Sequence, residues 1–578
     1  MSRDEGAGDP GFEQFERFLE EWSRRDFLRR MGMSAAWLAF SAGAVELLEA
    51  CGGGGTNTTS VNPVKGGKLI EGTISDISTF NTLNSGDVNS TQMITLNFDG
   101  LLGISGKGEN IPMLAQALPT VSADQLTFTY KLRPNLKWSD GQPLTADDVV
   151  FTYKLIFSPD TKDFVSRYRA NLEGYVKSVM ATDPQTVVFQ FNKVLANFVD
   201  THSRYGILPK HVLGDTAPKA LNTHSFFSGP TVSSGVFKFV RWDKGQQVVL
   251  ARNENYWAGQ SHLDQYIFKV VSDAVVLAQQ LKTGELDTGQ PDASQFDNLK
   301  TVNNLAAISF INPGFVYYQF NLGPGTKGSQ LFGDKNVRKA LHTALDRASM
   351  AKAAYFGNAV PADSPEAPTT WAYNPGVTPK YTFDKAKAES LLDAAGWMKG
   401  ADGIRANNGV KLSFELNTNA GNKVRENLVA IMQQQWHDIG VDATPRPIAF
   451  QTLVTQIRAT HTFQVILIGI AFGDTDPDQT TLWTSSGIGS GGLNGMQYKN
   501  PQVDDMMAKA LQTTDRSKRK PFYNQIQDII MDDLPAPILF YPNYLWGINN
   551  RVKNFNVAPY NTYQGRAWMK DVFVTDGK

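Results

Sequence analysis

The stretch that most constrains the fold of this chain is residues 463–479, which read FQVILIGIAFGDTDPDQ. Its apolar run, residues 465–470, is rich in β-branched side chains and predicts a strand buried on both faces. Three carboxylates, those of Asp474, Asp476 and Asp478, follow the end of this strand. Open α/β sheets bind ligands beyond the carboxyl ends of their strands, so this loop is a candidate site for a ligand with a cationic group. The alternative is a solvated turn in which the Asp side chains cap backbone groups.

The segments before this strand predict a β-loop-α-β-α-β order. If the strands are parallel, the loop after the first strand and the acidic loop open on the same edge of one sheet. The first loop carries the amides of Asn417, Asn419 and Asn422, so amides and carboxylates would meet at one crevice. The predicted elements are a strand at 410–416, a helix at 424–439, a short strand at 441–444, and a helix from 449 to about 458.

Length and charge restrict the class of protein. A chain of 578 residues is longer than one core usually serves, so we expect two or more lobes. The formal net charge of -1 provides no basic face for a nucleic acid. Cys51 is the only cysteine, which excludes a disulfide within the chain.

Catalytic and metal-binding motifs are scarce. The seven histidines include no HExxH pair, and Ser490 lies in GIGSGG rather than in a GxSxG elbow. Residues 323–328 fit GxGxxG, but Pro324 lies inside the loop, which favours a connecting loop over a nucleotide site. The acidic loop lacks the glycine and glutamate of a calcium-binding EF-hand. We therefore expect no cofactor, no metal and no enzyme activity.

The N-terminal region has the layout of an export signal. Arg24 and Arg25 precede an apolar segment, residues 31–45, which is short for a membrane span. The Arg-Arg-x-Phe-Leu pattern resembles a Tat signal, and the residues before Cys51 resemble a lipobox. A glycine-rich stretch follows Cys51 and suits a flexible tether. This resemblance implies that Cys51 is lipidated and anchors the protein outside the cytoplasm; an uncleaved helix with one buried thiol is the alternative.

Five motifs further along the chain occur in a recognisable order. The first, LRPNLKWSDGQPLTADDVVFTY, covers residues 132–153, and within it Thr145 and Asp148 predict a helix-capping box. The other four are SSGVF at 233–237, LKTGELD at 281–287, VRKAL through DR at 337–347, and DKAKAESLLDAAGW at 384–397. Together they resemble the family 5 extracellular solute-binding proteins, which are the oligopeptide, dipeptide and nickel receptors of ABC importers. The resemblance covers nearly everything after about residue 66.

This resemblance implies an α/β fold of the type II periplasmic-binding-protein kind, bilobal, with an extra inserted subdomain. After the signal region (1–50) and the tether (51–63), it divides the chain into three parts. Lobe I comprises 64–104, 229–316 and 545–578, the inserted subdomain 105–228, and lobe II 317–544. The chain is expected to cross between lobes near 315–321 and 535–546, and hinge closure would bury the ligand.

The resemblance also implies where the ligand binds. Peptide receptors of the family hold the ligand's ammonium group with an aspartate at the position of Asp474. Dipeptide receptors clamp the ligand's carboxylate with an arginine in the loop at 417–422, but that loop has none here and Arg425 follows in the helix, which argues against a dipeptide. The candidate ligand-binding residues are Asp474, Asp476, Asp478, Asn417, Asn419, Asn422, Trp483, Trp371, Tyr373, Trp546, Ser234 and Phe80.

We therefore predict a lipid-anchored monomeric receptor that delivers a peptide-like solute to an ABC permease. The permease would work with a separate ATPase, because this chain has no GxxxxGK[ST] loop. A polar non-peptide ligand such as an oligosaccharide is an alternative within the same role. A secreted hydrolase and a sensor domain are the alternatives from other classes.

Overall fold

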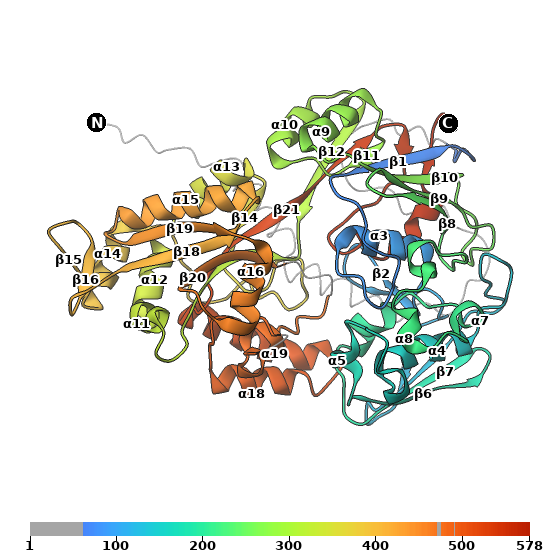
Figure 1. Cartoon of the computed structure of the whole chain (residues 1–578), viewed down its shortest axis with the longest axis horizontal. Coiled ribbons are helices and arrows are strands. Elements are labelled where there is room, and N and C mark those ends of the chain that lie inside the picture. Colours follow the sequence, from blue (N-terminus) through green and yellow to red (C-terminus); the bar gives the residue numbers. More distant parts are fainter. Residues whose placement is uncertain (1–61, 471–474, 490–491, 578) are drawn as a thin grey trace, which may run out of the picture. The chain divides into compact units, whose positions relative to one another are not determined.

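The computed structural model describes residues 62–470, 475–489 and 492–577 (Figure 1). The predictions for Arg24, Arg25, Cys51 and Asp474 lie outside these residues. The described part is a mixed α/β structure with one twelve-stranded sheet and a separate four-stranded sheet. None of its helices is both long and apolar enough to cross a membrane.

The strand predicted from the apolar run is present as β20 (Val465–Ile470). It lies inside the twelve-stranded sheet, between β18 (Ser413–Asn419) and β13 (Phe315–Phe320). Successive β20 residues enter two different cores: Val465 and Leu467 pack in one, Ile466 and Ile468 in the other. The prediction of burial on both faces is thus confirmed, because helices cover each side of this sheet.

The predicted β-loop-α-β-α-β order is confirmed. Strand β18 is parallel to both β19 (Asp442–Ile448) and β20, so the carboxyl ends of these three strands meet at one edge. Helix α15 (Lys423–His437) packs on β18 and β19. The helix predicted from 449 is α16 (Phe450–Thr455), which continues into one π-helical turn, η4 (Gln456–Thr460).

Strand β21 (Ile538–Asn549) connects the two halves of the large sheet. Its first part pairs with β13 and with β14 (Ala359–Pro361), in the half of the sheet that also holds β18, β19 and β20. From Asn543 onward it pairs with β12 (Leu305–Ile311) and β11 (Thr288–Gly289) of lobe I. This exchange of partners lies within 535–546, where the sequence predicted a crossing between lobes.

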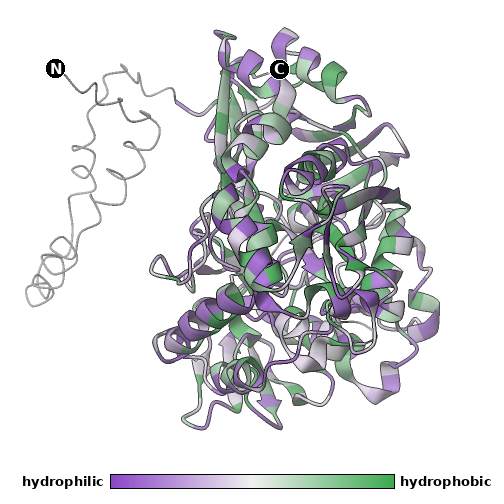
Figure 2. Cartoon of the chain, turned by 90° about the vertical axis from the view of Figure 1, so that its left-hand side faces the viewer, coloured by the Kyte–Doolittle hydropathy of each residue, from purple (hydrophilic) through white to green (hydrophobic). Residues whose placement is uncertain are grey.

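The remaining helices of lobe II surround this half of the sheet in two groups. Figure 2 shows purple and green residues following one another along the same helices, as expected where one face packs on a core and the other meets solvent. One core includes residues of α11 (Lys327–Phe332), α12 (Lys335–Thr343), α13 (Arg347–Tyr355) and α14 (Lys385–Ala394). The other includes α17 (Thr480–Trp483), α18 (Pro501–Ala510) and α19 (Arg516–Asp533).

The lobe I half of the sheet begins with β1 (Lys68–Thr73), which runs parallel to β10 (Gln265–Val270) and β11. Helix α3 (Val88–Asn97) is held by its N-cap Asp87, whose side chain accepts from the Ser90 N–H. The same half of the sheet includes β8 (Phe237–Asp243) and β9 (Gln247–Arg252), with α9 (Ala274–Thr283) and α10 (Ala293–Lys300) nearby. Two further pairs of strands form small separate sheets: β2 (Leu102–Ile104) with β3 (Asn110–Pro112), and β22 (Val552–Lys553) with β23 (Phe573–Val574).

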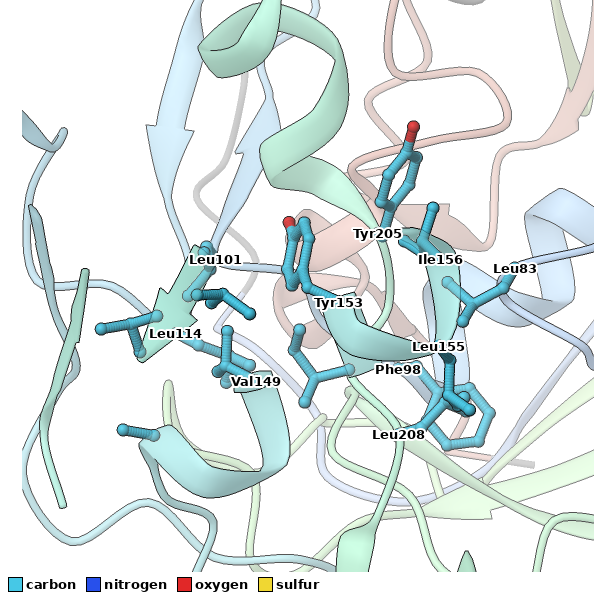
Figure 3. Packing of buried hydrophobic residues seen from close by; sticks show 14 of the residues in the cluster. Leu83, Phe98, Leu101, Leu114, Val149, Tyr153, Leu155, Ile156, Tyr205 and Leu208 are labelled. Atoms are coloured by element: carbon cyan, nitrogen blue, oxygen red, sulfur yellow. The ribbon is translucent and has the colours of Figure 1, made fainter. Parts of the chain in front are cut away.

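The inserted subdomain carries the four-stranded sheet, in the order β4-β5-β7-β6. The predicted capping box of Thr145 and Asp148 is confirmed at the start of α4 (Ala146–Phe157). Figure 3 shows Val149, Tyr153 and Ile156 of this helix in the core that it shares with neighbouring segments. The subdomain's strands are β4 (Thr120–Val121), β5 (Thr127–Lys131), β6 (Val176–Asp183) and β7 (Thr186–Phe191).

Candidate functional site

The common edge of β18, β19 and β20 positions the predicted amide loop. Asn419 is the last residue of β18, and Asn422 is the N-cap of α15, where its side chain accepts from the Arg425 N–H at 3.0 Å. Asn417 is buried on β18, and its Nδ2 donates to Gln456 Oε1 at 3.0 Å. The structure thus brings the three asparagines to one edge, while two of them already serve the fold.

Arg425 lies at this edge although it belongs to the first turn of α15. Its Nη1 donates to Asn419 Oδ1 at 2.7 Å. A Cβ atom on Gly469 of β20 would lie 2.7 Å from Nη2, so the glycine leaves room for the guanidinium. Burial lowers the pKa of Arg425, yet an arginine stays protonated in proteins. Among the described residues no carboxylate forms an ion pair with it, so a ligand carboxylate is a suitable partner.

The acidic loop resumes in the described chain at Thr475. Asp476 is buried and forms a bidentate ion pair with Arg519 of α19, at 2.5 and 2.8 Å. Asp478 Oδ1 accepts from the N–H and the hydroxyl of Thr480 at the start of α17. Both carboxylates are therefore occupied by groups of the protein, which agrees with the turn alternative for these two residues.

The two lobes together line a cavity of about 420 Å³. Its lining includes Val424 at the start of α15, but neither Arg425 nor the three asparagines of the amide loop. Lobe I contributes the end of β1, the start of α3 and the segment after β11; lobe II contributes residues around Tyr355, Val424, which precedes Arg425, and the middle of β21. The lining side chains include Glu71, Ile74, Val88, Asn89, Ala274, Asp292, Tyr355, Asn358, Asn543 and Tyr544.

Several predicted ligand-binding side chains lie in the protein core. Phe80, Trp483 and Trp546 have at most 1% of their surface exposed. The Trp483 indole donates to Gln479 Oε1 at 2.6 Å, and the Ser234 hydroxyl accepts from the Asp99 N–H at 3.1 Å. None of these four residues lines the 420 Å³ cavity, so the structure gives them packing roles.

The other predicted aromatic walls are half-buried. Trp371 stacks edge-on against Tyr523, and its ring lies 5.5 Å from the guanidinium carbons of Arg516 and Arg519. The carbonyl oxygens of Trp371 and Tyr373 both accept from Lys520. These contacts join the loop at 371–373 to α19 and to the Asp476–Arg519 pair, on the lobe II side of the acidic loop.

A buried acid lies beside this group. Glu366 accepts from Gln479 Nε2 at 2.6 Å and from the Thr370 hydroxyl at 3.2 Å. Burial raises the pKa of Glu366 to about 8, because the ionised form loses its hydration. The carboxyl is therefore mostly protonated at neutral pH, behind the loop that carries Asp476 and Asp478.

The inserted subdomain also contacts lobe II, away from β21. Asp200 Oδ1 accepts from Arg516 Nη2 at 2.9 Å and from Asn110 Nδ2 at 2.5 Å. Arg204 Nη2 donates to the Thr475 hydroxyl at 3.3 Å, at the start of the acidic loop. These contacts bridge parts of the chain that only β13 and β21 join covalently, so they are placed to hold the two lobes together.

The described residues contain no group of three or more His, Cys, Asp or Glu side chains arranged to hold a metal ion. The cavity offers amides, aromatic hydroxyls, carboxylates and apolar side chains, with the guanidinium of Arg425 nearby. Such a set is suited to binding a polar organic solute.

The sequence did not predict that lobe I residues line the cavity, or that the Arg425 guanidinium returns to the edge of the sheet at Asn419. The spacing of Arg425 after Asn422 places it one turn into a helix, and only the folded side chain shows its return to Asn419. Gly469 in the middle of an otherwise apolar β-branched strand was the available signal, since a glycine there indicates close approach by another group.

The chain belongs to the family described as bacterial extracellular solute-binding proteins, family 5, whose middle region matches residues 109–492. It has the bilobal type II periplasmic-binding fold with an inserted subdomain, as the resemblance implied. Lobe II, lobe I and the cavity between them are thus the parts of a solute-binding protein.

Particular relatives narrow the comparison. The chain is 32% identical to the oligopeptide-binding protein AppA of Bacillus subtilis over 521 residues, 89% of this chain and 94% of AppA. The solved structure of AppA with a nonapeptide superposes with a TM-score of 0.74, covering 89% of this chain and 99% of AppA. Protein XP55 of Streptomyces lividans is 30% identical, over 92% of this chain and 93% of XP55. NikZ of Campylobacter jejuni, solved with Ni(L-His), is 26% identical with a TM-score of 0.73, over 86% of this chain and 99% of NikZ.

Proposed function

We propose that this protein is the extracytoplasmic receptor of an ABC importer and that it encloses a peptide-like solute between its lobes. The observation that carries the proposal is the 420 Å³ cavity, whose walls come from both lobes on either side of β21. Similarity to AppA, which was solved with a nonapeptide, supports a peptide as the solute. The role is binding and release; the transport energy comes from a separate ATPase.

The lobes of this proposal are those drawn from the sequence: 64–104, 229–316 and 545–578 for lobe I, 105–228 for the inserted subdomain, and 317–544 for lobe II. The exchange of partners along β21 supports a hinge near Pro542. Rotation about β13 and β21 would open the cavity, and the Asp200–Arg516 pair would part in the open form.

Two charges would orient the peptide. Arg425 is the proposed partner of its carboxylate, because the guanidinium has no carboxylate partner among the described residues and lies beside Val424 and Tyr355 of the cavity. This revises the argument against a dipeptide, which rested on the absence of an arginine from the loop at 417–422. Asp474 is the proposed partner of the ligand's ammonium group, by resemblance to the family's peptide receptors.

The N-terminal region completes the proposal. Export through Arg24 and Arg25 followed by lipidation of Cys51 would hold a monomeric receptor at the outer face of the membrane, beside its permease. The family's extracellular location supports export. Metabolic labelling with a fatty acid tests the anchor: label is expected in the protein and lost in Cys51→Ala.

Thermal unfolding with a panel of solutes tests the binding role. Peptides of two to nine residues, oligosaccharides and nickel salts are each added to the purified protein. A ligand present at a hundred times its Kd should add about 2.7 kcal/mol to the free energy of unfolding. A shift with peptides that is lost in Asp474→Ala supports the peptide assignment. A shift with oligosaccharides or nickel alone would indicate that one of these is the solute instead of a peptide. Cleavage of peptides by the pure protein would favour a hydrolase.

A further inference from the structure

We propose that the cavity selects peptides that carry an uncharged, apolar side chain, and that this side chain binds to a small apolar surface of lobe I. The surface is made of Ile74, Val88 and Ala274 and is called the lobe I shelf below. The inference rests on the proposed function, because it assigns the kind of peptide that the same cavity takes.

The lobe I shelf is apolar and accessible. Ile74 follows β1, Val88 begins α3, and Ala274 begins α9, so three separate segments converge on one wall. Ile74 is 55% exposed and Val88 is 49% exposed. Single exposed apolar residues are common on protein surfaces, but a group that lines one cavity marks a binding surface.

No lysine or arginine of the described chain lines this cavity, and the lobe I shelf itself carries no charge. Among the cavity's described lining residues, only Glu71 and Asp292 are ionisable carboxylates. Glu71 is buried and accepts from Arg566 at 3.0 Å, Tyr266 at 2.7 Å and Gln92 at 2.5 Å. The Asp292 side chain caps α10.

Glu71 therefore already has charged and polar partners within the protein, whereas Asp292 accepts from a backbone N–H. On the lobe I shelf itself, a lysine or aspartate side chain of the ligand would lose hydration without gaining a partner of opposite charge from Ile74, Val88 or Ala274.

Polar lining residues suit the peptide backbone instead. Asn89, Asn358 and Asn543 line the cavity from both lobes. Amide side chains both donate and accept hydrogen bonds, so they can pair with peptide groups whatever the ligand's sequence. The backbone of the ligand is then held by amides of both lobes, while the lobe I shelf distinguishes the side chain.

The test compares matched pentapeptides by isothermal titration calorimetry on the purified protein. In an all-alanine pentapeptide, each position in turn is replaced by Val, Lys or Asp. At one position we expect the Val peptide to bind at least about tenfold more tightly than the Lys and Asp peptides, the effect of burying one branched side chain. In the double variant Ile74→Ser with Val88→Ser, this preference should fall below about threefold.

Val240→Ser is the matched control. Val240 is 47% exposed on β8, outside the cavity lining, so its replacement should leave the preference unchanged. Both substituted positions are exposed, and unchanged thermal unfolding of the double variant would show that its fold is retained.

The possible results separate the role of the lobe I shelf from peptide binding itself. Equal binding of Val, Lys and Asp peptides at all positions, or a preference that survives the double substitution, overturns the lobe I shelf while leaving peptide binding intact. The second of these results would indicate that the exposed valine and isoleucine meet another partner, such as the permease. If no pentapeptide binds but another solute of the panel shifts thermal unfolding, this inference is overturned and the receptor role stands. If no solute of the panel binds, both are overturned.

Discussion

At the scale of single residues, the structure changes the roles that the sequence predicted for Arg425 and Asp476. Asp476 was predicted to meet the ligand, but its carboxylate is buried against Arg519. Arg425 was set aside because it lies within α15, but its guanidinium returns to Asn419 at the edge of the sheet. A sequence shows the spacing of charged residues, whereas the partner of each long side chain is decided by packing from distant segments.

Replacing Arg425 tests its proposed contact with the ligand. Arg425→Met should weaken binding of a peptide with a free carboxyl terminus by about tenfold to a hundredfold, the loss of one charge-assisted hydrogen bond. The same peptide with an amidated terminus should bind the variant and the unchanged protein alike. Calorimetric titration of the two peptides measures this, and an equal loss for both would remove Arg425 from carboxylate recognition.

Replacing Asp476 separates a structural role from a ligand role. Asp476→Ala leaves the buried guanidinium of Arg519 without its partner, so the free energy of unfolding should fall by about 3–5 kcal/mol. Asp478→Ala, which removes the contacts to Thr480 and a 3.5 Å hydrogen bond from Asn197, should cost about 1 kcal/mol. Urea unfolding of the two variants gives the comparison; equal losses would contradict the assignment of the buried ion pair.

Glu366 provides a pH dependence of stability. Its folded-state pKa of about 8 lies above the usual value for a glutamate, because burial disfavours the ionised carboxylate. The folded protein therefore holds a proton that the unfolded chain releases between about pH 4.5 and 8, and the stability falls as the pH rises through this range. The slope from this group approaches about 1.4 kcal/mol per pH unit.

The variant Glu366→Gln should lack this contribution. Urea unfolding between pH 5 and 8 measures the difference in free energy of unfolding between the variant and the unchanged protein. That difference should shift in favour of the variant as the pH rises. Two parallel pH profiles would show that Glu366 does not carry a proton in the folded state.

At the scale of elements, the strand order and the helix caps were predictable because they depend on local patterns. The apolar run at 465–470, the asparagines at the end of β18 and the predicted capping box of Thr145 and Asp148 all occur as expected. The lining of the cavity was not predictable, since Ile74, Asn358 and Asn543 are brought to one cavity only by long-range strand pairing. The placement of Trp483 in the core likewise depends on distant segments, because the same core includes Phe315 of β13 and Ile538 of β21.

Replacing Asn422 tests whether this residue stabilises helix α15, contacts the ligand, or does both. Its side chain caps α15, so Asn422→Ala should reduce the free energy of unfolding by about 1 kcal/mol. Asn422→Ser, which restores a capping oxygen, should recover most of this loss. Urea unfolding checks both variants, and peptide affinity measured beside it shows whether Asn422 also meets the ligand. Full stability of the alanine variant would contradict the cap.

At the scale of the whole molecule, closure of the lobes depends on contacts far from β21. The Asp200–Arg516 pair is partly solvated, and such a pair typically contributes up to about 1 kcal/mol. Arg516→Gln should therefore release a bound peptide about two- to fivefold faster, as measured by stopped-flow fluorescence. Lys518→Gln, on the same helix but paired only with Asp515, should leave the release rate unchanged. Equal rates in all three proteins would remove this pair from the closed form.

Hydrogen–deuterium exchange with and without a bound peptide examines directly whether the solute lies between the lobes. Slower exchange is expected on both lobes when the peptide is bound. The segments are 71–75, 88–92 and 290–293 on lobe I, and 355–358 and 542–545 around the cavity on the lobe II side. Protection confined to one lobe, or located away from these segments, would contradict a ligand enclosed by both.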